Sequence, residues 1–305
     1  MTNDKPKFSI LIPTWNNLEF LKLCVESIET CSTYEHEILI HVNDGSDGTL
    51  DWVKSKGLKY TYSKENIGVC WALNTLRRLV TTDYIVFVND DMYMLPEWDK
   101  VFYKEIERIG HKYFFLSATT IQKYNDRKRK YLIIEADYGS TPETFRKEEL
   151  LDSFREYEGV DWLGSTAPPN IVHRDIWDLV GGYSIEFSLG MTSDQDFSAK
   201  LWLAGVRYFR GLSDSRCYHF MSKTVERIRL NFGPLQFLRK YGITKRTFEL
   251  YMLHQSQTVA NEHDTESQLR RSRWIYQIKK LFFIWYDARE KKLWEATPYV
   301  PEQER

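Results

Sequence analysis

Short apolar runs alternate with amphipathic stretches along the first 120 residues of this 305-residue chain. Runs of four to six mainly apolar or β-branched residues predict strands at 8–13, 37–42, 59–62 and 84–88. Apolar residues at helical spacing predict helices between them, at 18–30, 49–54 and 69–80. Strands that alternate with helices are typical of an α/β fold with a mostly parallel, Rossmann-like sheet flanked by helices.

The later part of the chain is less regular. Residues 113–140 predict further strands around a basic turn, and residues 141–160 are charged and rich in turn formers. Helices are expected to end near Gly182 and to span 196–204, after which 206–209 resembles a strand. From residue 224 the pattern is helical, with interruptions at Gly233-Pro234 and Gly242. We therefore expect one domain over 1–222 and a helical extension over 223–305.

Length and charge narrow the function. The length suits one large α/β domain with an appendage, or two modest domains. A formal net charge of -1 argues against a nucleic-acid-binding protein, which usually carries a basic excess. The 15% share of aromatic residues is high. It fits a large aromatic core, sugar-stacking platforms or an aromatic membrane face.

The four cysteines form no CxxC pair, which disfavours a zinc site. Cys24 and Cys31 fall on one predicted helix and would lie roughly 10.5 Å apart, too far for a disulfide. The first residues lack the apolar segment of a signal peptide, and no window holds 18 apolar residues. We therefore expect reduced thiols in a cytoplasmic protein without a membrane-spanning helix.

Polar residues follow three of the predicted strands, at the end of the sheet where open α/β folds bind ligands. Thr14 and Asn16 follow the first strand, and Asp44 and Ser46 follow the second. Asn89-Asp90-Asp91 follows the apolar strand 84–88. Adjacent carboxylates there are costly unless they are solvated or neutralised, and a divalent cation is a natural partner. Taken singly, each of these segments also fits a capped or solvated turn.

Four further residues have two interpretations each. Asp194 and Asp196 precede or begin a predicted helix, so they serve either as helix-start acids or as a general base and its neighbour. His219 is either structural or a metal ligand, and Trp162 is either a core residue or a platform that stacks on a sugar.

The order of these segments resembles family 2 glycosyltransferases of the GT-A fold. The resemblance covers roughly residues 7–222. It is carried by 9–17, 42–49, 65–68 with Ala72 and Asn74, 84–91, 180–184 and 194–201. It implies a nucleotide-sugar half over about 1–120 and an acceptor half over about 121–222.

The resemblance also implies roles for individual residues. The positions that would contact the donor are Thr14, Asn16, Asp44, Ser46, Asn66, Asn89 and Asp90. Asp91, the third position of the DxD-type motif, would bind a metal, with His219 completing the coordination. Asp194 matches the base, although Ser193 stands where the family often has Glu, and Asp196 is then a rival base.

The implied reaction is an inverting transfer to a saccharide or glycolipid acceptor, in surface polysaccharide biosynthesis. Asp194 would take the acceptor's proton, and a bound cation would stabilise the departing diphosphate. A histidine ligand favours Mn²⁺ over Mg²⁺, and Asp44 favours UDP. The acceptor is expected to contact Trp162, Asp196 and the segments 162–170 and 187–191.

Residues 267–294 combine basic and aromatic side chains. Such a helix suits packing on the catalytic domain, dimerisation, or peripheral contact with the inner face of an anionic membrane.

Two other functions use similar residues. A nucleotidyltransferase also carries paired aspartates but usually has a Gly-rich phosphate loop near its start, which residues 13–17 do not form. A non-catalytic carbohydrate-binding protein on the same scaffold would have no need of Asp91, Asp194 and His219.

Overall fold

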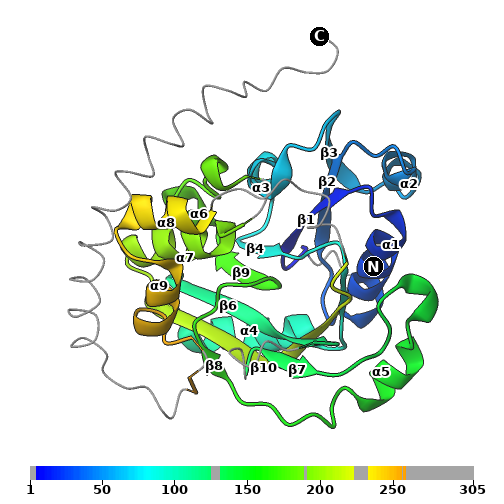
Figure 1. Ribbon diagram of the computed structural model, residues 1–305. Helices are drawn as coiled ribbons and strands as arrows, with labels where there is room; N and C mark the ends of the chain where they lie inside the picture. The colour runs from blue at the N-terminus through cyan, green and yellow to red at the C-terminus, as the bar shows by residue number, and fades with distance from the viewer. Residues whose placement is uncertain (1–4, 125–130, 189–190, 223–232, 256, 259–305) are drawn as a thin grey trace.

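The computed structural model describes residues 5–124, 131–188, 191–222, 233–255 and 257–258. Within these ranges one sheet has the strand order β3-β2-β1-β4-β9-β6-β10-β5, with β7 beside β6 and β8 beside β10 (Figure 1). Its strands are β1 (Ser9–Trp15), β2 (Glu37–Asn43), β3 (Lys59–Ser63), β4 (Tyr84–Phe87), β5 (Met92–Met94), β6 (Phe114–Gln122), β7 (Ile133–Glu135), β8 (Trp162–Leu163), β9 (Asn170–His173) and β10 (Tyr208–His219).

The first four strands are parallel, because helical crossovers return the chain to the same end of the sheet each time. β9 then runs antiparallel between β4 and β6. β10 is parallel to β6 and antiparallel to β5, with His219 opposite Met92. These pairings bring the end of β10 to the start of β5, just beyond the carboxyl end of β4.

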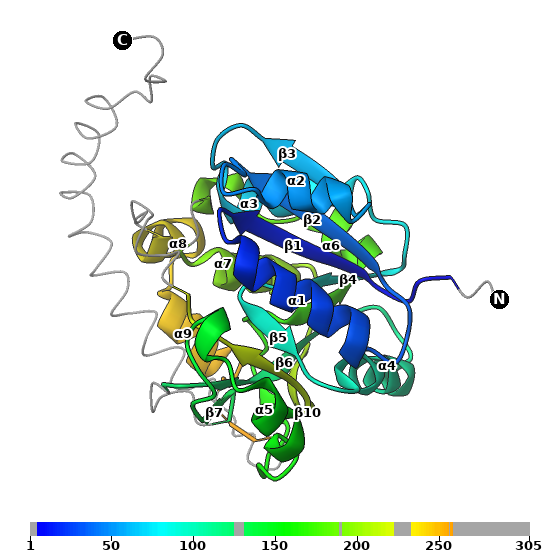
Figure 2. The same cartoon turned by 90° about the vertical axis from the view of Figure 1, so that its right-hand side faces the viewer.

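Helices cover both faces of the sheet (Figures 1 and 2). One face carries α1 (Leu18–Cys31), α2 (Thr49–Ser55) and α4 (Trp98–Ile109). The other carries α3 (Gly68–Arg77), α6 (Arg174–Leu179), α7 (Ser193–Leu203), α8 (Gly233–Tyr241) and α9 (Lys245–Tyr251). The shorter elements are η2 (Pro142–Thr144), α5 (Lys147–Ser153) and η3 (Ile185–Phe187).

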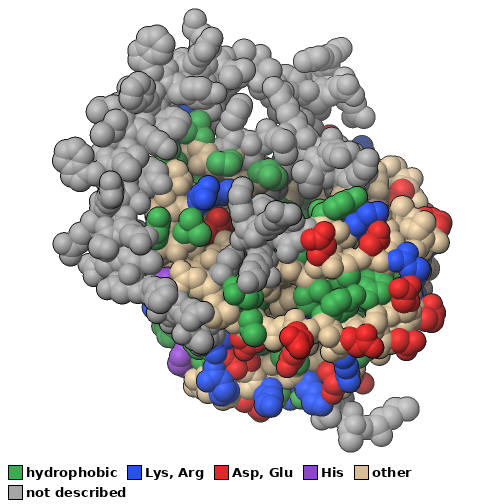
Figure 3. Space-filling view, turned by 60° about the horizontal axis from the view of Figure 1, so that its bottom comes forward, with side chains coloured by type: hydrophobic (Ala, Val, Ile, Leu, Met, Phe, Trp, Pro, Cys, Tyr) green, Lys and Arg blue, Asp and Glu red, His purple; other side chains and the backbone are tan. Residues whose placement is uncertain are grey.

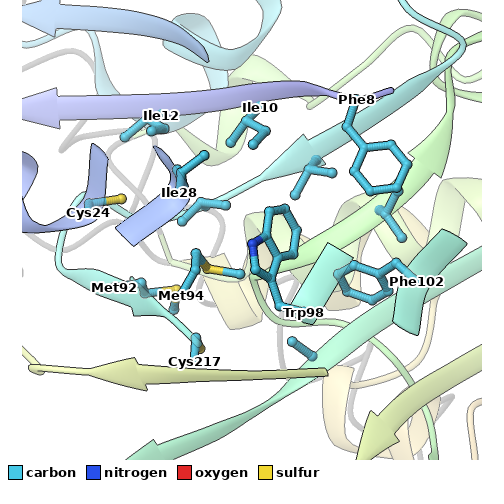
Figure 4. Close-up of a cluster of buried hydrophobic side chains, with 14 of the residues drawn as sticks. Phe8, Ile10, Ile12, Cys24, Ile28, Met92, Met94, Trp98, Phe102 and Cys217 are labelled. Carbon is cyan, nitrogen blue, oxygen red and sulfur yellow. The ribbon is translucent and has the colours of Figure 1, made fainter. Parts of the chain in front are cut away.

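The core on the α1 side joins β1, α1, β5, α4 and β10 (Figure 4). Trp98 is fully buried, and its ring packs edge-on to Phe102 at a centroid separation of 6.0 Å. Residues from the start and the end of the domain, such as Ile10 and Cys217, therefore share one interior.

The second core lies under α3, α6 and α7 and includes residues of α8 and α9. Phe237 and Phe248 are buried in the same cluster as Phe115 and Phe197. The chain then reaches β8, where the Leu163 amide donates to the Gln257 carbonyl at 2.9 Å. Residues 233–255 and 257–258 thus pack on the same side of the sheet as α7 and reach β8.

The expected α/β class and the mostly parallel, helix-flanked sheet are confirmed, and the elements of the first 88 residues lie within about three residues of their predicted bounds. The structure adds β5, α4, β9 and most of β10. It also places α5 in the segment expected to be turn-rich. Gly233 is the first described residue of α8, and residues 223–232, which precede it, lie outside the described ranges. Gly242 lies between α8 and α9, as expected.

All four cysteines are buried and free, as expected. No helix in the described parts of the chain is long and apolar enough to cross a membrane. On the face shown in Figure 3, acidic and basic side chains are interspersed around an apolar patch. The expected basic and aromatic segment 267–294 lies outside the described residues.

Candidate active site

The carboxyl ends of β1, β2 and β4 are joined by hydrogen bonds. The Thr14 hydroxyl at the end of β1 donates to Asp90 Oδ2 at 2.7 Å, just beyond β4. Asn43 Nδ2 at the end of β2 donates to the Thr14 carbonyl at 3.1 Å. Three segments far apart in the sequence therefore meet where the sheet topology predicted a ligand site.

Asn16, Asp44 and Ser46 form a second polar group at this edge. Asn16 Nδ2 donates to Asp44 Oδ2 at 2.7 Å and to Ser46 Oγ at 3.1 Å. Asn16 and Asp44 have φ of 46° and 62°, a left-handed conformation that costs energy for residues other than glycine and is common at functional sites. The Asn16 hydrogen bond is the main reason that the pKa of Asp44 is lowered, so this carboxylate stays ionised.

Asn43 organises the neighbouring loop, a role that the sequence analysis missed. Its Oδ1 accepts from the Ile67 amide at 2.9 Å and from Ser63 Oγ at 3.1 Å. Asn66 lies in this loop, and its Oδ1 accepts from the Gly68 amide at 2.9 Å, at the start of α3. The loop that carries Asn66 is therefore tied to the end of β2.

Asp91 and His219 are brought together, as the resemblance implied. Asp91 Oδ1 lies 3.3 Å from His219 Nε2, and Asp91 Oδ2 accepts from the Ser222 amide at 2.8 Å. The side chain of Asp91 is buried, whereas that of His219 keeps 23% of its surface exposed. The antiparallel pairing of β10 with β5 produces this contact across 131 residues between Asp91 and Ser222.

The charges of this pair stabilise each other. Burial raises the pKa of Asp91, but nearby His219 and the Ser222 amide outweigh it, and the net pKa is lowered. Burial likewise opposes protonation of His219, while the Asp91 carboxylate raises its pKa above the ordinary value. Both shifts favour an ionised carboxylate beside a protonated imidazole.

Gln122 determines which nitrogen of His219 is available as a ligand. Gln122 Nε2 donates to the Tyr124 carbonyl at 2.6 Å, which turns Oε1 toward His219. His219 Nδ1 lies 3.1 Å from that oxygen and must carry a hydrogen to bond with it. Once neutral, His219 therefore offers the lone pair of Nε2, the nitrogen that faces Asp91.

The Asp91–His219 pair fits one divalent cation that takes its other ligands from elsewhere. Neighbouring ligands of an octahedral ion with bonds of about 2.1 Å lie about 3 Å apart, close to the 3.3 Å between Oδ1 and Nε2. Among the described residues, no group of three or more His, Cys, Asp or Glu side chains surrounds a common point. The remaining ligands would have to be oxygen atoms of the sugar donor and water molecules.

Asn89 and Asp90 lie beside Asp91. The Asn89 carbonyl accepts from the Met92 amide at 3.2 Å, which closes the turn between β4 and β5. Asp90 is buried against Thr14. Their contacts with a donor stay predictions.

Asp194, the residue that the resemblance implied as the base, lies in the first turn of α7. Thr192, with φ of 72°, precedes the helix. Asp194 is partly buried, and its Oδ1 accepts from the Tyr183 hydroxyl at 3.4 Å.

The structure corrects the roles expected of Asp196. Its side chain is completely buried, accepts from the Tyr241 hydroxyl at 2.7 Å and pairs with Lys240 Nζ at 2.8 Å. Both partners belong to α8. Asp196 therefore anchors α8 to α7 and is neither an acceptor contact nor a rival base.

Trp162 is also corrected. Its ring is fully buried against Gly211, where an added Cβ would lie 1.7 Å from the indole. Its Nε1 donates to Thr119 Oγ1 at 3.1 Å. No face of the ring is left to stack on a sugar, so Trp162 is a core residue. In the expected acceptor segment 187–191, Phe187 is buried and residues 189–190 lie outside the described residues.

Comparison with known proteins gives matches in sequence and in fold. Glycosyltransferase GlyA of Streptococcus pneumoniae serotype 4 is 27% identical over 105 residues, which are 33% of this chain and 15% of that protein. The crystal structures of S. aureus TarS 1-349, alone and in complex with UDP, align with TM-scores of 0.51 at 18% identity. Each alignment covers 70% of this chain and 60% of the TarS chain, and this likeness shows the GT-A fold.

The family model described as Glycosyl transferase family 2 matches residues 9–161, just over half of the chain. Those residues include β1 through β7 and the donor-side polar groups around Thr14, Asp44 and Asp91. Family and fold agree, and this chain belongs to glycosyl transferase family 2.

Proposed function

We propose that this protein is an inverting glycosyltransferase that transfers the sugar of a UDP-sugar donor to a hydroxyl of a saccharide or glycolipid acceptor. The observation that carries the proposal is the Asp91–His219 pair, which lies at the same sheet edge as the Thr14–Asp90 and Asn16–Asp44 contacts. This arrangement offers a cation position beside a loop that can hold a nucleoside. The family match and the UDP complex of TarS support the donor class.

On the donor side, Asp44 would accept from an N–H of the uracil ring, and its lowered pKa keeps it ionised for that purpose. Asn16 holds the Asp44 carboxylate in place. Asp91 and His219 would hold Mn²⁺ or Mg²⁺. When bound, that ion neutralises negative charge on the diphosphate of the leaving group.

On the acceptor side, Asp194 would accept the proton of the attacking hydroxyl at its carboxylate. A base positioned in this way contributes roughly 10²–10⁴-fold. With one base, attack opposite the departing diphosphate inverts the anomeric carbon. Surface polysaccharide biosynthesis is the process that we infer for such an acceptor.

Binding of donors tests the first half of the proposal. We expect UDP-glucose, UDP-galactose and their N-acetylhexosamine counterparts to raise the melting temperature only when Mn²⁺ or Mg²⁺ is present. Asp91→Asn should abolish the metal-dependent part of the rise. A rise with nucleoside triphosphates and release of pyrophosphate would instead indicate a nucleotidyltransferase.

Asp194→Asn tests the chemistry. We expect at least a 10²-fold loss of transfer to a saccharide acceptor panel, with the affinity for the UDP-sugar unchanged, because the amide cannot take a proton. Asp51→Asn, in the exposed first turn of α2, is the matched control. Near wild-type turnover by the Asp194 variant would refute the base assignment.

A further inference from the structure

Tyr183 places a hydroxyl among aromatic rings, next to the side chains of Asn170 and Asp194. The side chain is 1% exposed, and its ring stacks on Phe197 with centroids 4.5 Å apart and planes 6° apart. Phe87 packs against it edge-on at 6.0 Å. Phenylalanine would fill the same space, so packing alone does not require the hydroxyl. The hydroxyl donates to Asp194 Oδ1 at 3.4 Å.

The backbone of Tyr183 is clamped by Asn74 of α3. Asn74 Nδ2 donates to the Tyr183 carbonyl at 2.7 Å, and the Tyr183 amide donates to Asn74 Oδ1 at 2.9 Å. Gly182 permits this approach, because its φ is +64° and an added Cβ would lie 2.3 Å from Asn74 Oδ1. Tyr183 therefore has a defined position relative to α3.

The same helix begins at the loop that is expected to contact the donor. Ser188 Oγ, directly after η3, donates to the Ile67 carbonyl at 2.7 Å at the start of α3. Two independent contacts, one at Tyr183 and one at Ser188, thus join the donor-side helix to the segment that precedes α7. The position of Asp194 is linked to the donor half through this segment.

The Tyr183 hydroxyl keeps its proton under ordinary conditions. Burial, and then the nearby Asp194 carboxylate, raise its pKa well above the usual value. Burial also raises the pKa of Cys70, on the facing side of α3, to about 12, so that thiol is neutral. The other ionisable groups of this corner are Glu186, Asp196, Lys200 and Lys240.

We propose that Tyr183 is a positioning residue whose hydroxyl orients the Asp194 carboxylate, and that Asn74 fixes Tyr183 relative to the donor-side helix. The kinetic consequence rests on the proposed function, in which Asp194 is the base. A separation of 3.4 Å is long for a hydrogen bond, and such bonds tighten when the substrates bind. The hydroxyl thus orients the Asp194 carboxylate, and the contact shortens when the substrates bind.

The direct test is the pKa of Asp194 in the full-length chain, measured by NMR with ¹³C-labelled aspartate. Asp194→Asn identifies the resonance. We expect Tyr183→Phe to raise the pKa of Asp194 by about 0.5 to 1 unit, because the carboxylate loses a hydrogen bond. Tyr241→Phe is the matched control, since it removes a hydroxyl from Asp196 and should leave the pKa of Asp194 unchanged.

A second variant tests the same contact by changing the position of the Tyr183 backbone. Asn74→Ala keeps the Tyr183 hydroxyl but removes the clamp, and it should raise the pKa of Asp194 in the same direction. If both variants fold, as judged by circular dichroism, and the pKa of Asp194 equals that of the wild type, the proposal is overturned. This measurement needs no turnover, so it is decisive even for a protein that transfers no sugar.

Steady-state kinetics test the effect on catalysis, with the UDP-sugar that binds in the thermal-shift panel as the donor. We expect Tyr183→Phe to lower kcat about 3- to 10-fold with an unchanged KM for the donor. The acid limb of the pH–rate profile should move to higher pH, because activity is lost as pH falls through the pKa of the base. A wild-type chain without turnover would count against the proposed function alone. A variant with the wild-type profile would count against Tyr183.

Discussion

The side chain of His219 shows how a neighbouring amide can decide the chemistry of a ligand. Gln122 is 7% exposed at the end of β6, and its orientation follows from the bond to the Tyr124 carbonyl. Hydrogen-bond partners of this kind typically change metal affinity by 10–100-fold when they are removed. Nothing in the sequence around Gln122 signals this role, because the contact with His219 spans 97 residues.

We therefore expect Gln122→Leu to weaken Mn²⁺ binding in the presence of UDP by about 10-fold or more. Titration of Mn²⁺ followed by electron paramagnetic resonance measures this without any turnover. Gln195→Leu removes an amide that bonds to Glu249 on α9 and does not contact His219, and it serves as the control. Equal affinity in both variants would show that Gln122 does not determine the tautomer.

Sequence reasoning succeeded for residues whose position depends on strand ends and failed for those whose direction depends on packing. Thr14, Asp44 and Asp91 follow apolar strands, so topology alone placed them together. Asp194 and Asp196 lie two positions apart in one helical turn and point to different environments. Which one is buried depends on the docking of α8, and no local pattern carries that information.

At the level of elements, the start of α4 is held by a buried carboxylate. Asp99 is 0% exposed and accepts from the amides of Thr33 and Tyr34 at 2.8 Å and from His36 Nε2 at 3.0 Å. Burial opposes ionisation, but these bonds outweigh it and lower the pKa of Asp99. The carboxylate thus links the loop before β2 to the N-terminus of α4, where the helix dipole also favours negative charge.

Asp99→Asn should lower the free energy of unfolding by about 2–3 kcal/mol at pH 7. The sign of the pH dependence follows from the lowered folded-state pKa. The contribution is complete above the unfolded value of about 3.9 and is lost as pH falls through the folded-state pKa. Urea unfolding at several pH values should therefore show the two proteins converging in acid. Asp51→Asn, exposed on α2, should change stability by no more than about 0.5 kcal/mol.

The turn after α6 provides a matched pair of glycines. Gly181 and Gly182 have φ of +72° and +64°, but an added Cβ meets nothing within 4 Å at Gly181, whereas at Gly182 it lies 2.3 Å from Asn74 Oδ1. Gly181→Ala should cost about 1–2 kcal/mol of backbone strain. Gly182→Ala should cost about 1–3 kcal/mol more, because it also forces Asn74 away. Equal midpoints in urea unfolding would contradict this difference.

The strand predictions failed where strands are short or polar. β5 has three residues, too few for a periodic pattern. β10 contains Arg210, Gly211, Asp214 and Arg216, so it does not read as a buried strand. Arg216 is nevertheless buried, because its guanidinium donates to the carbonyls of Phe154 and Tyr157. These backbone carbonyls compensate for the burial of the guanidinium, and they come together only in the folded chain.

At the scale of the whole molecule, two ion pairs of one lysine attach α8 to α7 and η3. Lys240 of α8 contacts Asp196 at 2.8 Å and Glu186 at 2.9 Å. Its side chain keeps 30% of its surface exposed, whereas Asp196 has none. The charge of Asp196 therefore depends on α8 for its neutralisation.

Lys240→Met should destabilise the protein by about 1–3 kcal/mol, because it removes the ammonium group that pairs with a buried carboxylate. In the double variant Asp196→Leu, Lys240→Met, the uncompensated charge is gone, and we expect part of that stability to return. Thermal and urea unfolding of the two variants measure the difference. A double variant less stable than Lys240→Met would show that the ion pair does not carry this coupling.

The antiparallel pairing of β10 with β5 has a consequence for the order in which the parts of the site form during synthesis. A ribosome delivers Asp91 long before His219 and Ser222, which close around it from 131 residues away. Strands β1 to β4 and their helices can pair locally, but contacts between such distant segments form late and slowly. A nascent chain that stops short of β10 would carry Asp91 without His219 and Ser222. In the proposed function, the cation position is therefore complete only after β10 has entered the sheet.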